Sequence, residues 1–282
     1  MNKQYADPSE RNNEIDRYIS TEIVDIQLLS SQPYEVHYKS SLPSVGFAFE
    51  TQTGIHSLGS DQTCIFKAKA NSLSFVPGDC DVFSSSEKGG EYLKITLKIT
   101  HENTYNNIPQ FSNFVHTEAI KAAYRLRKTL LTSHSTDMLI IEEYVAKLCG
   151  YNLLTGEKDS KSADSAQWIT SSRANKIDEY IEEHLEDQLT VEKLAKYCNL
   201  SSGFFSRDFK KAFGKSPKDY IIEKRISKAR HYLNTYDSGL SEIAFATGFS
   251  SHAHMTSVFK QRLGISPSGM RGRSKRFISI CK

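Results

Sequence analysis

The sequence predicts a two-domain protein of the α+β class, in which a β-rich domain with two helices precedes an all-α domain. Three observations support this prediction. Short β-rich runs fill residues 23–100, the hydrophobic period becomes helical from Thr117 onward, and a doubled helical unit occupies residues 194–267. At 282 residues the chain is long enough for two domains that each have their own core.

Composition argues against membrane-spanning, secreted and disulfide-stabilised classes. No apolar run approaches the roughly 20 residues of a membrane span, and residues 1–17 lack the apolar segment of a secretory signal. The cysteines are odd in number and form no C-x-x-C pair: Cys64, Cys80, Cys149, Cys198 and Cys281. This pattern predicts reduced thiols in a cytoplasmic protein rather than disulfides or a zinc site.

Charge is divided unevenly along the chain. Residues 168–282 contain 20 Lys and Arg against 12 Asp and Glu, a formal charge of +8, whereas residues 1–167 contain 16 against 21, which is −5. A basic C-terminal part on an acidic body indicates that only the C-terminal part meets a polyanion. A chance surface bias is the alternative interpretation.

The N-terminal part is predicted to be a flexible arm over residues 1–15, followed by a β-rich domain over residues 16–154. The closely spaced strands predict a sandwich or a small barrel. In the sharpest turn Pro77 sets φ and Gly78 is expected to supply the positive φ. The clearest strands are at 44–49, 64–68, 72–76 and 92–99, and the turns at Thr53-Gly54, Pro77-Gly78-Asp79 and Lys88-Gly89-Gly90.

Two amphipathic helices end this domain, one with apolar residues from Ile120 to Leu131 and one from Met138 to Tyr151. Their apolar stripes must be buried either on the β-rich domain or on a second subunit, and the sequence does not decide between them. Polar residues 155–168 predict a linker. An all-α domain is expected at 169–273 and a basic tail at 274–282.

The doubled unit repeats the same residues about fifty positions apart. Leu194-Ala195 corresponds to Ile243-Ala244 at an offset of 49, and Pro217 corresponds to Pro267 at an offset of 50. The second copy therefore contains one additional residue, which we place between Ala244 and Met255. The segment at 217–233 between the copies predicts a helix with a basic polar side (Lys218, Lys224, Arg225, Lys228, Arg230).

Each copy has the pattern of a helix-turn-helix unit. In the first copy Asn199 tolerates the left-handed turn and Ser201 caps a second helix that buries Phe205 and Phe209. In the second copy Gly248 takes the turn position, Ser250 or Ser251 the cap, and Met255 and Phe259 the inward face. The two motifs are expected at 191–212 and 240–262, and such units dock their second helix in a DNA groove.

The outward positions of the two second helices are candidates to contact base edges. These positions are Ser202, Gly203, Ser206, Arg207, His252, Ala253, Thr256 and Ser257. Arg207 can donate two hydrogen bonds to one guanine, so the first copy is the stronger candidate for base reading. Candidates for phosphate contacts are Ser201, Lys210, Lys211, Lys215, Ser250, Ser251, Lys260 and Arg262.

The stretch from Ser201 (SSGFFSRDFKKAFGKSP) through TGFSS at 247–251 to GISP at 264–267 resembles the AraC/XylS family of bacterial transcription regulators. The resemblance covers residues 173–271. It implies a seven-helix domain whose two recognition helices enter successive major grooves of promoter DNA, RNA polymerase as a partner, and regulation that is most often activation. Asp208 and Met270 depart from the family pattern. We expect Asp208 to add repulsion near phosphate and Met270 to loosen the terminal helix.

The N-terminal β-run, with VPGD at 76–79 and two helices after it, is similar to the cupin-like barrel that serves many family members as a sensor and dimerisation domain. This similarity implies a small-molecule effector and a homodimer through the helices at 117–154. The histidines His37, His56, His101, His116 and His134 are scattered, so we expect no metal, no cofactor and no enzymatic activity. Two alternatives are a cupin-type metal enzyme and a thiol redox sensor using Cys64 and Cys80, either of them with a DNA-binding domain attached.

Overall fold

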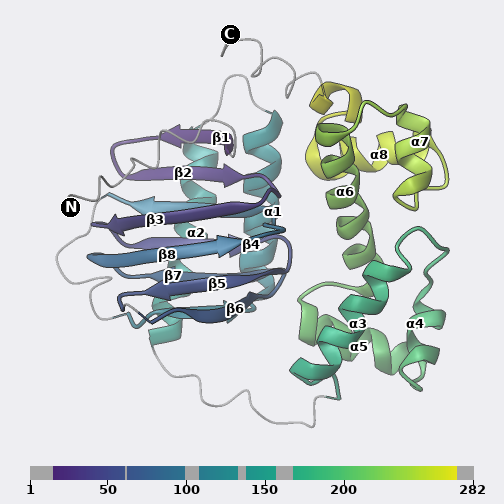
Figure 1. The fold of residues 1–282 in the computed structure, drawn as a ribbon, viewed down its shortest axis with the longest axis horizontal. Coiled ribbons are helices and arrows are strands. Elements are labelled where there is room, and N and C mark those ends of the chain that lie inside the picture. The colour runs from purple at the N-terminus through teal and green to yellow at the C-terminus, as the bar shows by residue number, and fades with distance from the viewer. Residues whose placement is uncertain (1–14, 61, 99–107, 133–137, 157–167, 272–282) are drawn as a thin grey trace. The chain divides into compact units, whose positions relative to one another are not determined.

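The structure is a computed structural model that describes residues 15–60, 62–98, 108–132, 138–156 and 168–271 (Figure 1). The chain divides into two compact units, Met1–Ser162 and Ala163–Lys282. The predicted two-domain α+β class is confirmed. The division lies inside the stretch expected to be the linker. Most of this stretch falls outside the described residues, and so do most of the predicted N-terminal arm and the basic tail. The exact domain limits stay predictions.

The N-terminal unit contains two antiparallel sheets. The first has the order β1 (Ile15–Ser20), β2 (Val24–Leu29), β9 (Tyr92–Leu97), β4 (Ser44–Ala48), β7 (Ser72–Val76), β10 (Phe111–Phe114). The second has the order β3 (Tyr34–Ser40), β8 (Cys80–Ser86), β5 (Gln52–Leu58), β6 (Cys64–Ala68). Over the described residues neither sheet closes on itself. The structure therefore has a pair of open sheets in place of the expected barrel, which corresponds to the sandwich that the sequence also allowed.

Two helices, α1 (Thr117–Thr132) and α2 (Met138–Gly156), cover one face of the six-stranded sheet (Figure 1). Alternate residues of its central strands point at these helices, because side chains along a strand face opposite sides in turn. The apolar stripe of α1, including Ala123 and Leu126, is buried within this unit. The sheet contributes Ile26, Leu28, Val45, Phe47, Leu73, Phe75, Leu93 and Ile95 to the same core.

Two of the predicted turns differ in detail. The positive φ of the 77–79 turn occurs at Asp79 (55°) and not at Gly78, because a short polar side chain also tolerates the left-handed region. Gly54 lies inside β5 rather than in a turn, and a Cβ there would come within 2.0 Å of the Ser85 carbonyl oxygen. Glycine at this position therefore permits the close approach of β8.

The C-terminal unit is helical, and both predicted helix pairs are present with a long helix between them. Its helices are α3 (Ser171–Glu183), α4 (Val191–Tyr197), α5 (Ser202–Phe213), α6 (Pro217–Thr235), α7 (Leu240–Ala246) and α8 (His252–Leu263). A further helical turn covers 267–271. Pro217 occupies the start of α6, where its missing N–H costs no hydrogen bond.

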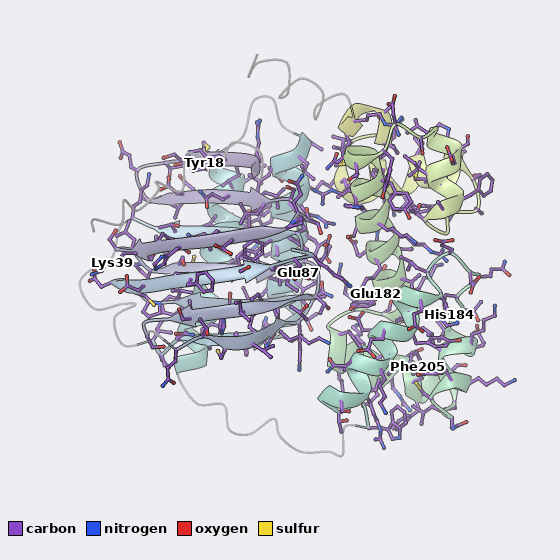
Figure 2. All side chains as sticks on the ribbon, viewed as in Figure 1. Tyr18, Lys39, Glu87, Glu182, His184 and Phe205 are labelled. Atoms are coloured by element: carbon purple, nitrogen blue, oxygen red, sulfur yellow. The ribbon has the colours of Figure 1, made fainter. Side chains whose placement is uncertain are left out.

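Of the basic residues predicted on the polar side of α6, Lys218 is exposed, whereas Lys224 and Arg225 are used in contacts inside the unit. Lys224 Nζ lies 2.9 Å from Asp178 Oδ1 and 2.5 Å from Glu182 Oε1 on α3, where Glu182 is labelled in Figure 2. Arg225 donates to the carbonyl oxygens of Leu185 and Asp187 at 3.1 and 2.8 Å. These cations hold α6 to α3 and to the loop that follows it.

Candidate nucleic-acid interface

The first helix-turn-helix unit has the local geometry that its sequence predicted. Thr190 caps α4 by accepting from the Lys193 N–H, and Asn199 adopts a left-handed φ of 53°. The Leu200 N–H reaches back to the Ala195 carbonyl at 2.9 Å, which ends α4 in a tight turn. Ser201 then caps α5 by accepting from the Phe204 N–H.

The second unit repeats this geometry with one residue more. Gly248 has a φ of 81°, and the Phe249 N–H bonds the Ala244 carbonyl at 2.9 Å. Ser251 caps α8 by accepting from the His254 N–H at 3.1 Å. The turn residues Asn199 and Gly248 are 49 positions apart and the caps Ser201 and Ser251 are 50 apart. The additional residue therefore lies in the turn between Gly248 and Ser251, within the predicted interval.

Apolar faces fix the orientation of both recognition helices. Phe205, Phe209 and Phe213 of α5 are buried, and the Phe209 and Phe213 rings stack with centroids 4.1 Å apart. The corresponding face of α8 is formed by Met255, Val258, Phe259 and Leu263. Burial of these faces turns the opposite sides of both helices to solvent.

Most of the eight candidate base-reading residues reach the surface. Gly203, Arg207, His252, Ala253 and Ser257 are exposed, whereas Ser202, Ser206 and Thr256 are partly exposed. The Thr256 hydroxyl is buried and has no hydrogen-bond partner in the described part of the chain. The Thr256 hydroxyl is therefore not at the surface of α8. Contact of any of these residues with bases stays a prediction.

The candidate phosphate contacts separate into two groups. Lys210, Lys211 and Lys260 are exposed, and none of them forms an ion pair with the described residues. Arg262 Nη2 instead lies 2.5 Å from Asp219 Oδ1, and Lys215 Nζ lies 3.6 Å from Glu223 Oε1. These last two cations are used inside the protein, which leaves less of their charge for DNA.

The three candidate serines also differ. Ser201 and Ser251 use their side-chain oxygens as helix caps, whereas Ser250 Oγ lies 2.9 Å from His254 Nδ1. All three lie at the N-terminal ends of the recognition helices, where backbone N–H groups and the helix dipole favour phosphate.

The two departures from the family pattern have structural explanations. Asp208 is buried and accepts a 2.7 Å hydrogen bond from the Ile169 N–H, so it has a structural role, and the expected repulsion near phosphate stays a prediction. Met270 is also buried, and its N–H bonds the Ser266 carbonyl at 3.0 Å. The terminal turn is thus packed rather than loosened.

Phe204 and His254 are surface residues that the sequence did not single out. They occupy matched positions three residues after the caps Ser201 and Ser251, and both are exposed, Phe204 to 40%. The helical period could have placed Phe204 at the surface. Phe205 and Phe209, four residues apart, define the inward face of α5, and Phe204 is rotated about 100° from Phe205.

The alternatives of a metal site or a reactive thiol gain no support. Over the described residues no group of three or more His, Cys, Asp or Glu is arranged to hold a metal ion. Cys64 and Cys80 are free, and burial together with the neighbouring Asp81 raises the pKa of the Cys80 thiol. A raised pKa lowers the fraction of reactive thiolate. None of the described helices has the length and hydropathy to span a bilayer.

Comparison with known proteins finds similarity to transcription regulators over about a third of the chain. Residues 194–273 match a helix-turn-helix domain family. The probable transcriptional regulator LumQ of Photobacterium leiognathi is 33% identical over 92 residues, which are 33% of this chain and 37% of that protein. The transcriptional activator RhaS of Escherichia coli O139:H28 is 29% identical over 102 residues, 36% of this chain and 37% of that protein.

These alignments span about 37% of the length of the two relatives. Among solved structures, the DNA-binding domain of the transcription factor AdpA, in complex with target DNA, is 30% identical and covers 36% of this chain and 92% of that one, with a TM-score of 0.35.

Proposed function

We propose that the protein is a bacterial transcription regulator of the AraC/XylS type that binds promoter DNA through α5 and α8. The match of residues 194–273 to a helix-turn-helix domain family and the similarity to a transcriptional activator support the proposal. The observation that carries the proposal is the doubled unit, in which two capped helices present exposed polar faces of matched geometry. A single helix-turn-helix pattern is common, but two with the same turn and cap on a basic unit fit adjacent major grooves.

Both recognition helices carry residues for affinity, and they differ in how they read sequence. Arg207 on α5 supplies the bidentate donor that discriminates guanine. Lys210, Lys211 and Lys260, exposed at the C-terminal ends of the helices, supply salt-dependent attraction to phosphates. The α8 face, with His252, Ala253 and Ser257, adds contacts that depend more on groove shape.

The remaining parts of the proposal concern the rest of the chain. We assign effector sensing to the N-terminal unit, and also homodimerisation through α1 and α2. The DNA-bound protein then contacts RNA polymerase and acts as an activator in the cytoplasm. The names of the regulator and activator relatives support the regulatory role, and the hollow between the two sheets, described below, supports the sensing role. No catalytic role is proposed.

Gel-shift and footprinting assays on the DNA upstream of the protein's own gene test the proposal. We expect a footprint that covers two successive major grooves and an affinity that falls steeply with salt. Binding that does not change with salt, or equal affinity for unrelated DNA, would contradict it. Ser241→Ala on α7, an exposed residue outside the recognition helices, serves as a surface control.

A further inference from the structure

A cavity of about 480 Å³ lies between the two sheets of the N-terminal unit. This volume is within the range of small-molecule sites, about 300–1,000 Å³. β-Sandwiches usually fill this space with interdigitating apolar side chains. Here the apolar core of the unit lies on the other face of the six-stranded sheet, against α1 and α2.

Strand register shows which side chains face the cavity. Gln27, Lys94, Gly46 and Ser74 are direct neighbours across β2, β9, β4 and β7, so they form one row on the cavity face, and its side chains are polar. Leu93 and Ile95, which alternate with Lys94, point the opposite way into the core. The floor of the cavity is therefore polar because side chains along each strand alternate between the two faces of the sheet, and not because of a local irregularity.

Gly46 makes room for the Tyr92 side chain on this floor. A Cβ on Gly46 would lie 1.6 Å from the Tyr92 hydroxyl oxygen, so the Tyr92 side chain lies across the glycine. The Tyr92 and Ser74 hydroxyls share a hydrogen bond of 2.8 Å. Burial raises the pKa of the Tyr92 phenol, which stays neutral and keeps its hydrogen.

The opposite wall, from the four-stranded sheet, adds further hydroxyl and amide groups. Tyr34 Oη lies 3.4 Å from Gln52 Oε1 and 3.3 Å from Ser84 Oγ. The Phe66 ring stacks on His56 with centroids 4.9 Å apart. Burial lowers the pKa of His56, so this imidazole adds little positive charge near pH 7.

Lys94 is the charged group of the cavity. Its Nζ donates to the Tyr38 hydroxyl at 2.9 Å and lies 4.3 Å from the centroid of the Tyr38 ring. No Asp or Glu is among the described residues that line the cavity, and none of the described carboxylates pairs with Lys94. A partly enclosed cation without a counter-ion is unfavourable, and an anion bound beside it removes that penalty.

We propose that this cavity binds a small carboxylate that carries an aromatic or other flat ring, with the carboxylate on Lys94 and Tyr38 and the ring between Tyr34, Phe66 and Tyr92. Lys94 is one inward-facing cation, so it matches a ligand with one negative charge. Lys67 also borders the cavity, but its register partner is the exposed Thr53, on the outer face of β6. The ring is inferred from the aromatic side chains on both walls, which favour flat partners. The proposal rests on the sensing role given above to the N-terminal unit.

Isothermal titration calorimetry on the full-length protein tests the inference with benzoate and 1-naphthoate, each paired with its neutral amide. We expect saturable 1:1 binding of at least one carboxylate and binding of its amide at least roughly 10-fold weaker. Lys94→Met should weaken carboxylate binding by roughly 10- to 100-fold, the usual range for a lost hydrogen bond to a charged group. The matched control Lys67→Met should change it by less than about 2-fold.

Tyr38→Phe provides a milder variant that keeps the ring and removes only the hydroxyl, with an expected loss of roughly 3- to 10-fold. Circular dichroism confirms that each variant is folded. The inference is overturned if neither carboxylate binds at about 10 mM, if an amide binds as well as its acid, or if Lys94→Met and Lys67→Met behave alike. Gel shifts on the same sample separate the two proposals: DNA binding without carboxylate binding overturns this inference alone, and the reverse result overturns only the DNA-binding proposal.

Discussion

The two helix-turn-helix units have the same turn and cap geometry but opposite surroundings. Asn199, at the first turn, is exposed to solvent. At the equivalent Gly248 a Cβ would lie 2.2 Å from the Leu185 carbonyl oxygen and 2.7 Å from Arg225 Nε. The first turn is therefore free on its outer side, whereas the second is enclosed by the loop after α3 and by α6.

The two helix-turn-helix units also differ in net charge. Residues 191–213 contain five Lys and Arg and two Asp and Glu, a charge of +3, whereas residues 240–263 contain two and one, a charge of +1. One of the two cations in the second unit, Arg262, is paired with Asp219. One sequence pattern thus yields a unit suited to contact DNA and a second unit that is more firmly tied to the rest of its domain.

The largest effect is expected from a comparison of Gly248→Ala with Asn199→Ala. Both place alanine at a positive φ, which costs about 1–2 kcal/mol. Only Gly248→Ala adds a clash with backbone, so we expect it to lower the free energy of unfolding by roughly 3 kcal/mol or more. Urea unfolding followed by Trp168 fluorescence reports on the C-terminal unit, because Trp168 is the only tryptophan. Equal losses for the two variants would show that the second turn is not enclosed.

A second test compares Arg207→Ala with Ser257→Ala, which occupy matched positions 50 residues apart. Loss of a bidentate guanine contact should cost about 1–3 kcal/mol of DNA-binding free energy and relax specificity at one base pair. Loss of the serine hydroxyl should cost less than about 0.5 kcal/mol. Gel shifts with single-base operator variants measure both effects. A larger loss at Ser257 would reverse the assignment of the stronger reader.

A third test concerns the pH dependence of the pair between Asp219 and Arg262. Burial acts to raise the pKa of Asp219, but the Ser216 hydrogen bond and Arg262 outweigh it and hold the pKa below its ordinary value. The stability from this carboxylate is therefore present above the unfolded-state pKa of about 3.9 and lost as pH falls through the lower folded-state pKa.

We expect the unfolding free energy of the wild type to fall more than that of Asp219→Asn between about pH 5 and pH 2. The difference should be at most about 1 kcal/mol, because the Asp219 side chain is 42% exposed. Urea titrations at several pH values check it. Parallel pH profiles for the two proteins would mean that the pair does not stabilise α8.

The smallest effect is expected from two neighbouring cations of α8. Lys260→Ala should reduce the salt dependence of DNA binding by about one unit in the slope of log affinity against log salt concentration. Arg262→Ala should leave that slope nearly unchanged, because Asp219 already neutralises the guanidinium. Gel shifts over a series of salt concentrations provide the slopes, and a larger change for Arg262→Ala would show that it reaches phosphate.

Features that depend on neighbouring residues could be predicted from the sequence. Asn199 and Gly248 were identified as left-handed turn residues, and Ser201 as a cap, because each depends on a few adjacent positions. The outward position of Arg207 followed from the period of the buried Phe205 and Phe209.

Features that depend on distant partners could not. Arg262 pairs with Asp219, and Asp208 with Ile169, across 43 and 39 residues, and no local pattern shows which cation meets which carboxylate. In β9 the alternation of Tyr92 and Lys94 with Leu93 and Ile95 predicts two faces of different polarity. It does not show that the polar face borders a hollow between sheets, since that depends on where α1 and α2 pack.

The bond between Asp208 and Ile169 has a mechanical consequence. The chain enters the C-terminal unit at Trp168 and Ile169, where Arg173 donates to the Trp168 carbonyl at 2.7 Å and Asp208 holds the Ile169 N–H at 2.7 Å. Tension that arrives along the chain from the N-terminal side is therefore transferred to α5 at its middle turn. The point where the chain enters the unit is thus coupled directly to the helix that carries Arg207.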